Sequence, residues 1–221
     1  SRGLGDVYKR QLLPEGFCGD DLQKTALLTR TSGSDAKMTR DEVVRMLSER
    51  VGEDFAGEMA RRVVAADAVA TLYAVATDPA AVLPRPLREK VAFRSAYVLE
   101  RLYFRWPERF MPHAERFCER DFAAASGMSA RRCFGKIMAD LLRRFRPSDD
   151  AAERIAEAAA EWLADLSSPV AVKVRAFEVL ERCRDRVAWV DGSWSDLLDL
   201  FARNATPGIT CRLRRLQEKN C

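Results

Sequence analysis

From residue 38 onward, apolar residues recur at intervals of three or four positions, and no stretch alternates between apolar and polar residues. The first pattern places apolar side chains on one face of an α-helix, whereas alternation would indicate a half-buried strand. We therefore predict an all-α fold. The helices are expected at residues 40–51, 54–77, 86–105, 108–124, 129–145, 149–166, 169–186, 193–204 and 207–218.

The expected helices are separated by short segments that contain proline, glycine, serine or aspartate. Thr39 stands just before Asp41 and Glu42, so its hydroxyl can cap a helix whose first turn is acidic. Short connections of this kind are expected between antiparallel helices.

One segment of the chain is repeated. Residues 91–102 (VAFRSAYVLERL) match residues 172–183 (VKVRAFEVLERC) at a constant offset of 81. Half of that offset leads to residues 132–138 (RCFGKIM), whose apolar positions fit the same helical frame. Repeats of ~40 to 47 residues built from two helices are typical of α-solenoids, in which each hairpin buries its apolar faces against its neighbours.

The repeated segment also carries a resemblance. Residues 174–180 (VRAFEVL), which follow Ser168 and Pro169, and residues 94–99 (RSAYVL) in the earlier copy resemble the second helix of a HEAT repeat. The stretch from about Leu87 to Leu216 resembles small bacterial HEAT-like proteins, most of all at residues 169–180 (PVAVKVRAFEVL). The resemblance implies a HEAT-like α-α solenoid of stacked antiparallel hairpins, wound as a right-handed superhelix over residues 38–221. It transfers no catalytic residue.

Residues 12–37 show neither a helical nor an alternating pattern of apolar residues. Residues 6–11 (DVYKRQ) resemble the peptide encoded by the end of a transposon adapter used to prepare sequencing libraries. Segments of foreign origin carry no information about a fold. We expect residues 1–37 to be a disordered or non-native leader, with two alternatives for residues 12–37: a non-native segment ahead of a natural start at Met38, or a genuine flexible tail.

Composition excludes several classes of protein. The 221 residues are 48% hydrophobic and 32% charged, which favours a folded chain with its own core over a disordered one. The longest apolar stretch, residues 63–76, contains Asp67 and is shorter than the ~18 residues that a membrane span needs. We therefore expect no membrane partner.

The residues that hold metals are sparse. His113 is the sole histidine, and the six cysteines form no Cys-x-x-Cys pair, so we expect no metal site and no cofactor. Cys133 and Cys183 lie within apolar helical patterns, where a free cysteine behaves as a small core residue. No signal peptide is visible, which favours a reducing cytoplasm.

Charge differs between alternate helices, although the whole chain carries only +4. The net charge is +4 for residues 85–105, +5 for 131–146, +2 for 170–186 and +3 for 207–221. It is −1 for 107–123, −5 for 149–166 and −2 for 191–206. Because the second helices of stacked hairpins line the concave surface of a solenoid, the sequence predicts a basic concave face.

The cations on these second helices fall on stripes. Arg94, Arg101 and Arg105 share one face of a helix, and the second copy repeats this stripe 81 residues later. Stacked helices would join such stripes into a basic ridge that suits an extended polyanion, either an acidic protein segment or a nucleic acid. The candidate binding residues are Arg94, Arg101, Arg105, Arg132, Lys136, Arg143, Arg175, Arg182, Arg186, Arg212 and Arg215.

The ridge has a structural alternative. HEAT repeats often use an arginine at the position of Arg94 and Arg175 in a ladder between hairpins. Pairs four residues apart, such as Glu178 with Arg182 and Lys136 with Asp140, would make the ridge an ordinary solvated face.

Two functions follow from the sequence. The first is a non-enzymatic scaffold that holds a polyanion on the basic face. The alternative is a DNA-lesion enzyme resembling the alkylpurine DNA glycosylases, for which Asp140 is the acidic candidate on the central inner helix. Among the aromatic residues, Trp162 is expected in the core and Phe104 in helix packing, whereas Trp189 and Trp194 flank a loop where a stacking contact is an option.

Overall fold

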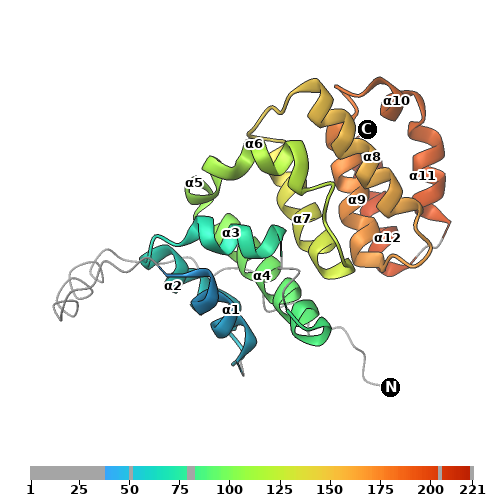
Figure 1. Cartoon of the computed structure of the whole chain (residues 1–221). Coiled ribbons are helices and arrows are strands. Elements are labelled where there is room, and N and C mark those ends of the chain that lie inside the picture. The colour runs from blue at the N-terminus through green and yellow to red at the C-terminus, as the bar shows by residue number, and fades with distance from the viewer. Residues whose placement is uncertain (1–37, 50–51, 79–82, 204–205, 220–221) are drawn as a thin grey trace, which may run out of the picture. The chain divides into compact units, whose positions relative to one another are not determined.

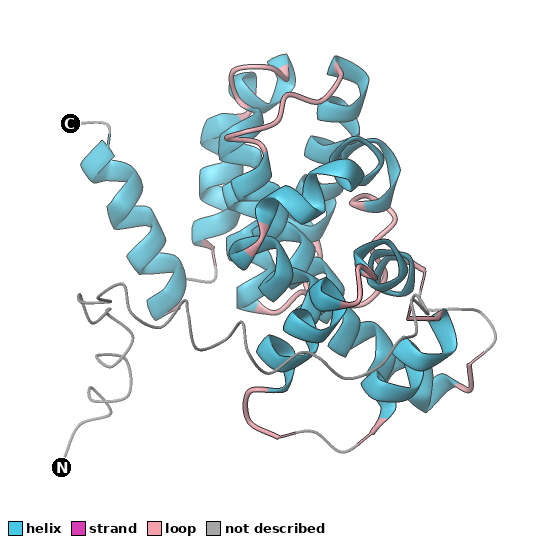
Figure 2. Cartoon of the chain, turned by 90° about the vertical axis from the view of Figure 1, so that its left-hand side faces the viewer, coloured by secondary structure: helices cyan, strands magenta, loops and turns pink. Residues whose placement is uncertain are grey.

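The computed structural model describes residues 38–49, 52–78, 83–203 and 206–219, and side chains at 208 and 215–219 are outside this description. The described residues belong to one compact unit, Lys37–Cys221 (Figure 1). The leader expected at residues 1–37 lies outside them. The secondary structure of the described part consists of helices without a strand, which confirms the all-α prediction (Figure 2).

The elements follow one another as α1 (Arg40–Ser48), α2 (Phe55–Ala65), α3 (Val69–Thr77), α4 (Arg85–Arg105), α5 (Pro107–Phe110), η2 (Met111–His113), α6 (Ala114–Arg116), η3 (Phe117–Asp121), α7 (Met128–Leu141), α8 (Asp149–Ala164), α9 (Val170–Cys183), α10 (Ala188–Gly192), α11 (Trp194–Ala202) and α12 (Pro207–Lys219). Among the described residues, no helix is both long and apolar enough to cross a membrane.

The predicted cap of the first helix is confirmed. The Thr39 hydroxyl accepts a hydrogen bond from the Glu42 backbone N–H at 3.3 Å, and the Glu42 carboxylate accepts one from the Thr39 backbone N–H at 2.7 Å. This reciprocal capping box pairs two N–H groups that a helix start otherwise leaves without partners. α8 begins in a similar way, because the Ser148 hydroxyl accepts from the Ala151 N–H at 3.2 Å.

Two expected helices are broken. Residues 54–77 form α2 and α3, because the chain turns at Asp67, whose φ is +48°. Aspartate tolerates this left-handed conformation better than most residues do. Residues 108–124 are divided into α5, η2, α6 and η3, because Pro112 lacks an N–H and the turn at Phe117–Asp121 is a π-helix. The five-residue α10 is an addition to the predicted elements.

Four helices pack in succession. α4 contacts α7, α7 contacts α9, and α9 contacts α12, while α1, α2 and α3 cover α4 and α11 packs on both α8 and α9 (Figure 1). The contact of Glu100 with Lys136 and that of Tyr103 with Asp140 advance in the same direction along α4 and α7, so these two helices run parallel. We call α4, α7, α9 and α12 the inner helices, after the position that the sequence predicts for them.

The core agrees with the sequence at the residues singled out for it. Trp162 is 1% exposed, and Cys133 and Cys183 are buried. α7 and α9 approach closely at Gly135, where an added Cβ would lie 2.8 Å from the Cβ of Arg175. The inner helices are therefore packed with little space between their backbones at this point.

Candidate anion-binding surface

Arg94 belongs to the packing of α1 against α4. Its Nη1 donates to the carbonyl oxygens of Leu47 and Glu49, each at 2.7 Å, and its guanidinium lies 5.4 Å from the centre of the Phe55 ring. Carbonyls at the C-terminal end of a helix lack partners within the helix. Arg94 therefore caps α1 and contributes no free cation to a ridge.

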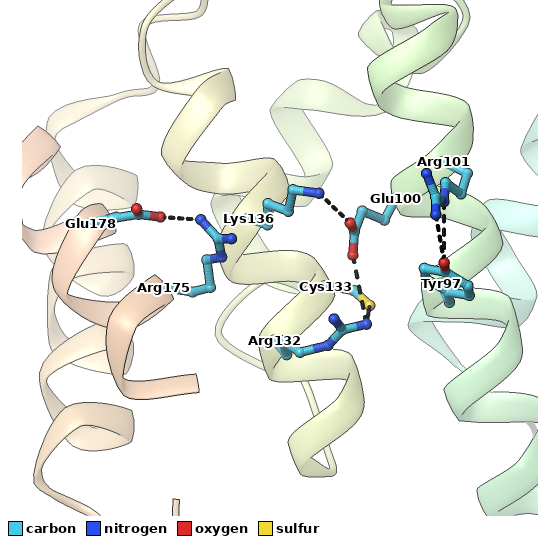
Figure 3. Close-up of polar contacts among 8 residues, drawn as sticks. All are labelled: Tyr97, Glu100, Arg101, Arg132, Cys133, Lys136, Arg175 and Glu178. Atoms are coloured by element: carbon cyan, nitrogen blue, oxygen red, sulfur yellow. Dashed lines mark hydrogen bonds and ion pairs between the residues drawn. The ribbon is translucent and has the colours of Figure 1, made fainter. Parts of the chain in front are cut away.

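A buried carboxylate joins α4 to α7. Glu100 is 4% exposed; its Oε1 accepts a hydrogen bond from Lys136 Nζ at 2.6 Å, and its Oε2 lies 4.0 Å from Arg132 Nη2 (Figure 3). A buried charge is costly unless it is paired, so both cations stabilise this interface. Cys133 lies beside them, and burial raises the pKa of its thiol to about 12.

The second copy of the repeat makes an equivalent contact. Glu181, which corresponds to Glu100 at the offset of 81, forms an ion pair with Arg212 of α12. Each glutamate thus holds a cation of the next inner helix. Nearby, Arg175 Nη1 donates to Glu178 Oε2 at 2.6 Å, so Arg175 is also paired (Figure 3).

The remaining candidates on the inner helices are more exposed. Arg101 donates from Nη2 to the Tyr97 hydroxyl at 2.7 Å, and this bond raises the pKa of Arg101 above its usual value. The Arg105 guanidinium lies 5.2 Å from the centre of a ring of Trp106. Arg182 is exposed and makes no hydrogen bond or ion pair within the described part of the chain. The side chain of Arg215 lies outside that part.

Several arginines surround one hollow of about 380 Å³ at the C-terminal ends of α7 and α9. We call this site the arginine hollow. The arginines that line it are Arg143, Arg144, Arg146, Arg182 and Arg186. The other lining residues are Leu142, Phe145 and Asp185.

Neighbouring groups contact three of these arginines. Arg186 Nη2 donates to the Pro147 carbonyl at 2.8 Å and to Asp149 Oδ1 at 2.6 Å, whereas its buried Nε has no partner among the described residues. Arg144 Nε lies 3.1 Å from Asp140 Oδ2, and Arg143 Nη1 lies 3.7 Å from Asp140 Oδ1. Asp140 therefore orients one edge of the hollow.

Sequence reasoning missed Arg144 and Arg146. Both lie beyond Leu141, the last residue of α7, and neither belongs to the stripe that was predicted for this helix. The run Arg143-Arg144-Phe145-Arg146 before Pro147 was the available signal.

Other candidates for chemistry are occupied by structural contacts. The His113 ring stacks on Tyr73 with centroids 4.4 Å apart, and burial lowers the pKa of His113. Trp194 packs on Phe177 at 5.0 Å, with the Arg184 guanidinium 4.5 Å from its ring. Within the described residues, no three His, Cys, Asp or Glu side chains form a group that could hold a metal ion.

Two phenylalanines of α4 are partly exposed, and for Phe104 this differs from what the sequence suggested. Phe93 and Phe104 are 45% and 44% exposed, although Phe104 was expected in helix packing. They share a face of α4 with Tyr97 because they are spaced four and seven residues from it. The hydrophobic pattern gave no sign of this exposure, since an exposed and a buried phenylalanine are alike in sequence.

Comparison with known proteins found no matching family model, no matching curated protein and no matching solved structure.

Proposed function

We propose that the chain is a HEAT-like α-solenoid that works as a non-enzymatic binding protein and holds an extended polyanion at its inner helices. The succession of α4, α7, α9 and α12 supports the solenoid, as does the covering of α4 and α9 by other helices. The two equivalent glutamates that hold the next inner helix support it further, because repeated contacts between neighbours are the basis of such folds.

The arginine hollow is the observation that carries the proposal. Five arginines line it, and Asp185 is the one acidic residue among its described lining residues. Asp140 and Asp149 outside the lining pair with three of these arginines. Arg143 and Arg182 are exposed, so both are available to a ligand. A guanidinium presents paired N–H donors that match the oxygens of phosphate or carboxylate groups, and like charges gathered in one place are stabilised by an anion.

The proposal is tested by the affinity of the full chain for heparin at several salt concentrations. We expect binding that weakens steeply with salt, because each ion pair formed with a polyanion releases counterions. Arg143→Glu combined with Arg182→Glu should weaken binding at least tenfold at low salt and flatten the salt dependence.

The matched control is Arg45→Glu combined with Arg109→Glu. Both residues are exposed, each pairs with one carboxylate, and neither lines the hollow. This variant changes the net charge by the same amount and should retain binding. Absence of heparin binding at low salt, or an equal loss in both variants, would refute the proposal.

The enzymatic alternative depends on Asp140. Its Oδ2 accepts a hydrogen bond from the Tyr103 hydroxyl at 2.8 Å and also lies 3.1 Å from Arg144. These contacts fit a residue that positions arginines. Release of a methylated base from alkylated DNA by the full chain would overturn the non-enzymatic proposal in favour of a glycosylase.

A further inference from the structure

One face of α4 carries three aromatic rings, Phe93, Tyr97 and Phe104, which we call the aromatic stripe. The rings of Phe93 and Tyr97 lie with centroids 6.3 Å apart and planes within 1° of parallel. The two rings are therefore stacked with their planes parallel. Almost half of the surface of Phe93 and of Phe104 is in contact with solvent.

Cations accompany these rings. The guanidinium groups of Arg101 and Arg132 lie 5.2 and 5.9 Å from the centre of the Tyr97 ring, and Lys136 Nζ lies 4.7 Å from that of Phe104. The Tyr97 hydroxyl fixes the Arg101 guanidinium beside the stripe (Figure 3). The Glu100 carboxylate offsets one of these three positive charges, so the net charge around the aromatic stripe stays positive.

The stripe is connected to the arginine hollow through direct contacts. The Phe104 ring packs edge-on against Tyr103 at 5.0 Å, and the Tyr103 hydroxyl donates to Asp140 at 2.8 Å. Asp140 in turn pairs with Arg144, which lines the hollow. At the other end, Phe93 lines a second hollow of about 340 Å³, with Ala92, Met128 and Ala130 among its walls.

The combination of partly exposed rings with cations selects among polyanions. An acidic peptide would satisfy the cations but leave the rings in water. A duplex offers phosphates, but its bases already stack on one another. A single strand offers both phosphates and unstacked base faces, and such strands bind to aromatic side chains within basic grooves.

We infer that the polyanion is a single-stranded nucleic acid, with bases that stack on Phe93 and Phe104 and phosphates that contact the surrounding cations and the arginine hollow. This inference rests on the proposed function and names its ligand class. Tyr97 acts as a positioning residue that orients Arg101.

The test compares three probes on the full chain by fluorescence anisotropy: oligothymidylate of about 20 nucleotides, an abasic deoxyribose-phosphate strand of the same length, and heparin. We expect the oligothymidylate to bind at least tenfold more tightly than the abasic strand, which carries the same charge without bases. An oligouridylate of equal length shows whether the site prefers RNA or DNA.

The variants separate stacking from charge. Phe93→Leu and Phe104→Leu should each weaken oligothymidylate binding by about fivefold or more while heparin binding stays unchanged. Phe93→Trp should restore or improve binding, because any aromatic ring supplies a stacking face. Leu166→Ala, at a residue that is 88% exposed, serves as the control for loss of exposed apolar surface and should change neither affinity.

Each outcome has a distinct meaning. Equal affinity for oligothymidylate and the abasic strand, or unchanged oligothymidylate binding in the leucine variants, would overturn stacking and leave the polyanion proposal standing. If the wild-type chain bound none of the three probes, the proposed function itself would be refuted. A dimer in sedimentation equilibrium that Phe93→Leu dissociates would assign the stripe to a second copy of the chain and overturn the inference.

Discussion

Gly135 offers a sharp test of the packing between the inner helices. In Gly135→Ala, the new methyl would lie 2.8 Å from the Arg175 Cβ and 3.7 Å from its carbonyl carbon. The first of these distances is shorter than a carbon–carbon contact allows, and the Arg175 Cβ is fixed to the backbone of α9. The two helices must therefore move apart to accept the methyl.

Two effects oppose each other in this substitution. Alanine is favoured over glycine inside a helix by about 1 kcal/mol. Overpacking of a closely packed interface costs about 1 to 3 kcal/mol. Since the contact is with an atom that cannot rotate away, we expect the upper part of that range, and hence a net loss of about 1 to 2 kcal/mol in the free energy of unfolding.

Gly57→Ala is the matched control. Its methyl would meet the Asp54 carboxylate at 2.6 Å, which is the end of a side chain that can swing aside. This variant should be neutral or up to about 1 kcal/mol more stable than the wild type. Urea unfolding followed by circular dichroism measures both, with unchanged m-values showing that the comparison is valid. If Gly135→Ala were as stabilising as Gly57→Ala, α7 and α9 would not approach as described.

Three further predictions concern buried charge and thiols. Lys136→Met should destabilise the fold by about 1 to 3 kcal/mol, because it removes the closest partner of a buried carboxylate. Glu100→Gln should destabilise the fold less, because it leaves a lysine that can reach water. Urea unfolding of both variants measures the difference. A thiol reagent at pH 8 should modify Cys211 quickly and spare the buried thiols until the chain unfolds, as peptide mapping by mass spectrometry will show. Burial raises the pKa of the buried thiols from 9.0 to about 12. The stability that this shift represents is therefore fully present below pH 9 and is lost as the pH rises toward 12. Urea midpoints that stay constant from about pH 9 to about pH 11 would contradict this prediction. The buried thiols are those of Cys118, Cys133 and Cys183.

The sequence predicts local structure well because the relevant interactions are local. The cap at Thr39 involves a residue three positions away, and Trp162 lies on a stripe that repeats within one helix. The break at Asp67 was missed because apolar residues continue through it at helical spacing, and a left-handed backbone leaves no mark on that pattern.

The pairing of charges was less predictable. Neighbours four residues apart suggested Glu178 with Arg182 and Lys136 with Asp140, but Glu178 pairs with Arg175, and Lys136 pairs with Glu100. Glu100 and Lys136 are 36 residues apart in the chain, so their contact exists only once α4 and α7 pack. The ridge therefore divides into cations that join the inner helices and cations that face solvent, a division that no spacing rule contains.

Arginine footprinting of the full chain tests the central claim most directly. The protein is treated with phenylglyoxal in the presence and absence of oligothymidylate, and modification at each arginine is measured by mass spectrometry. We predict protection of Arg143, Arg146 and Arg182, with Arg45 and Arg109 equally reactive in both samples. If oligothymidylate binds but protects Arg143, Arg146 and Arg182 no more than it protects Arg45 and Arg109, the central claim is wrong.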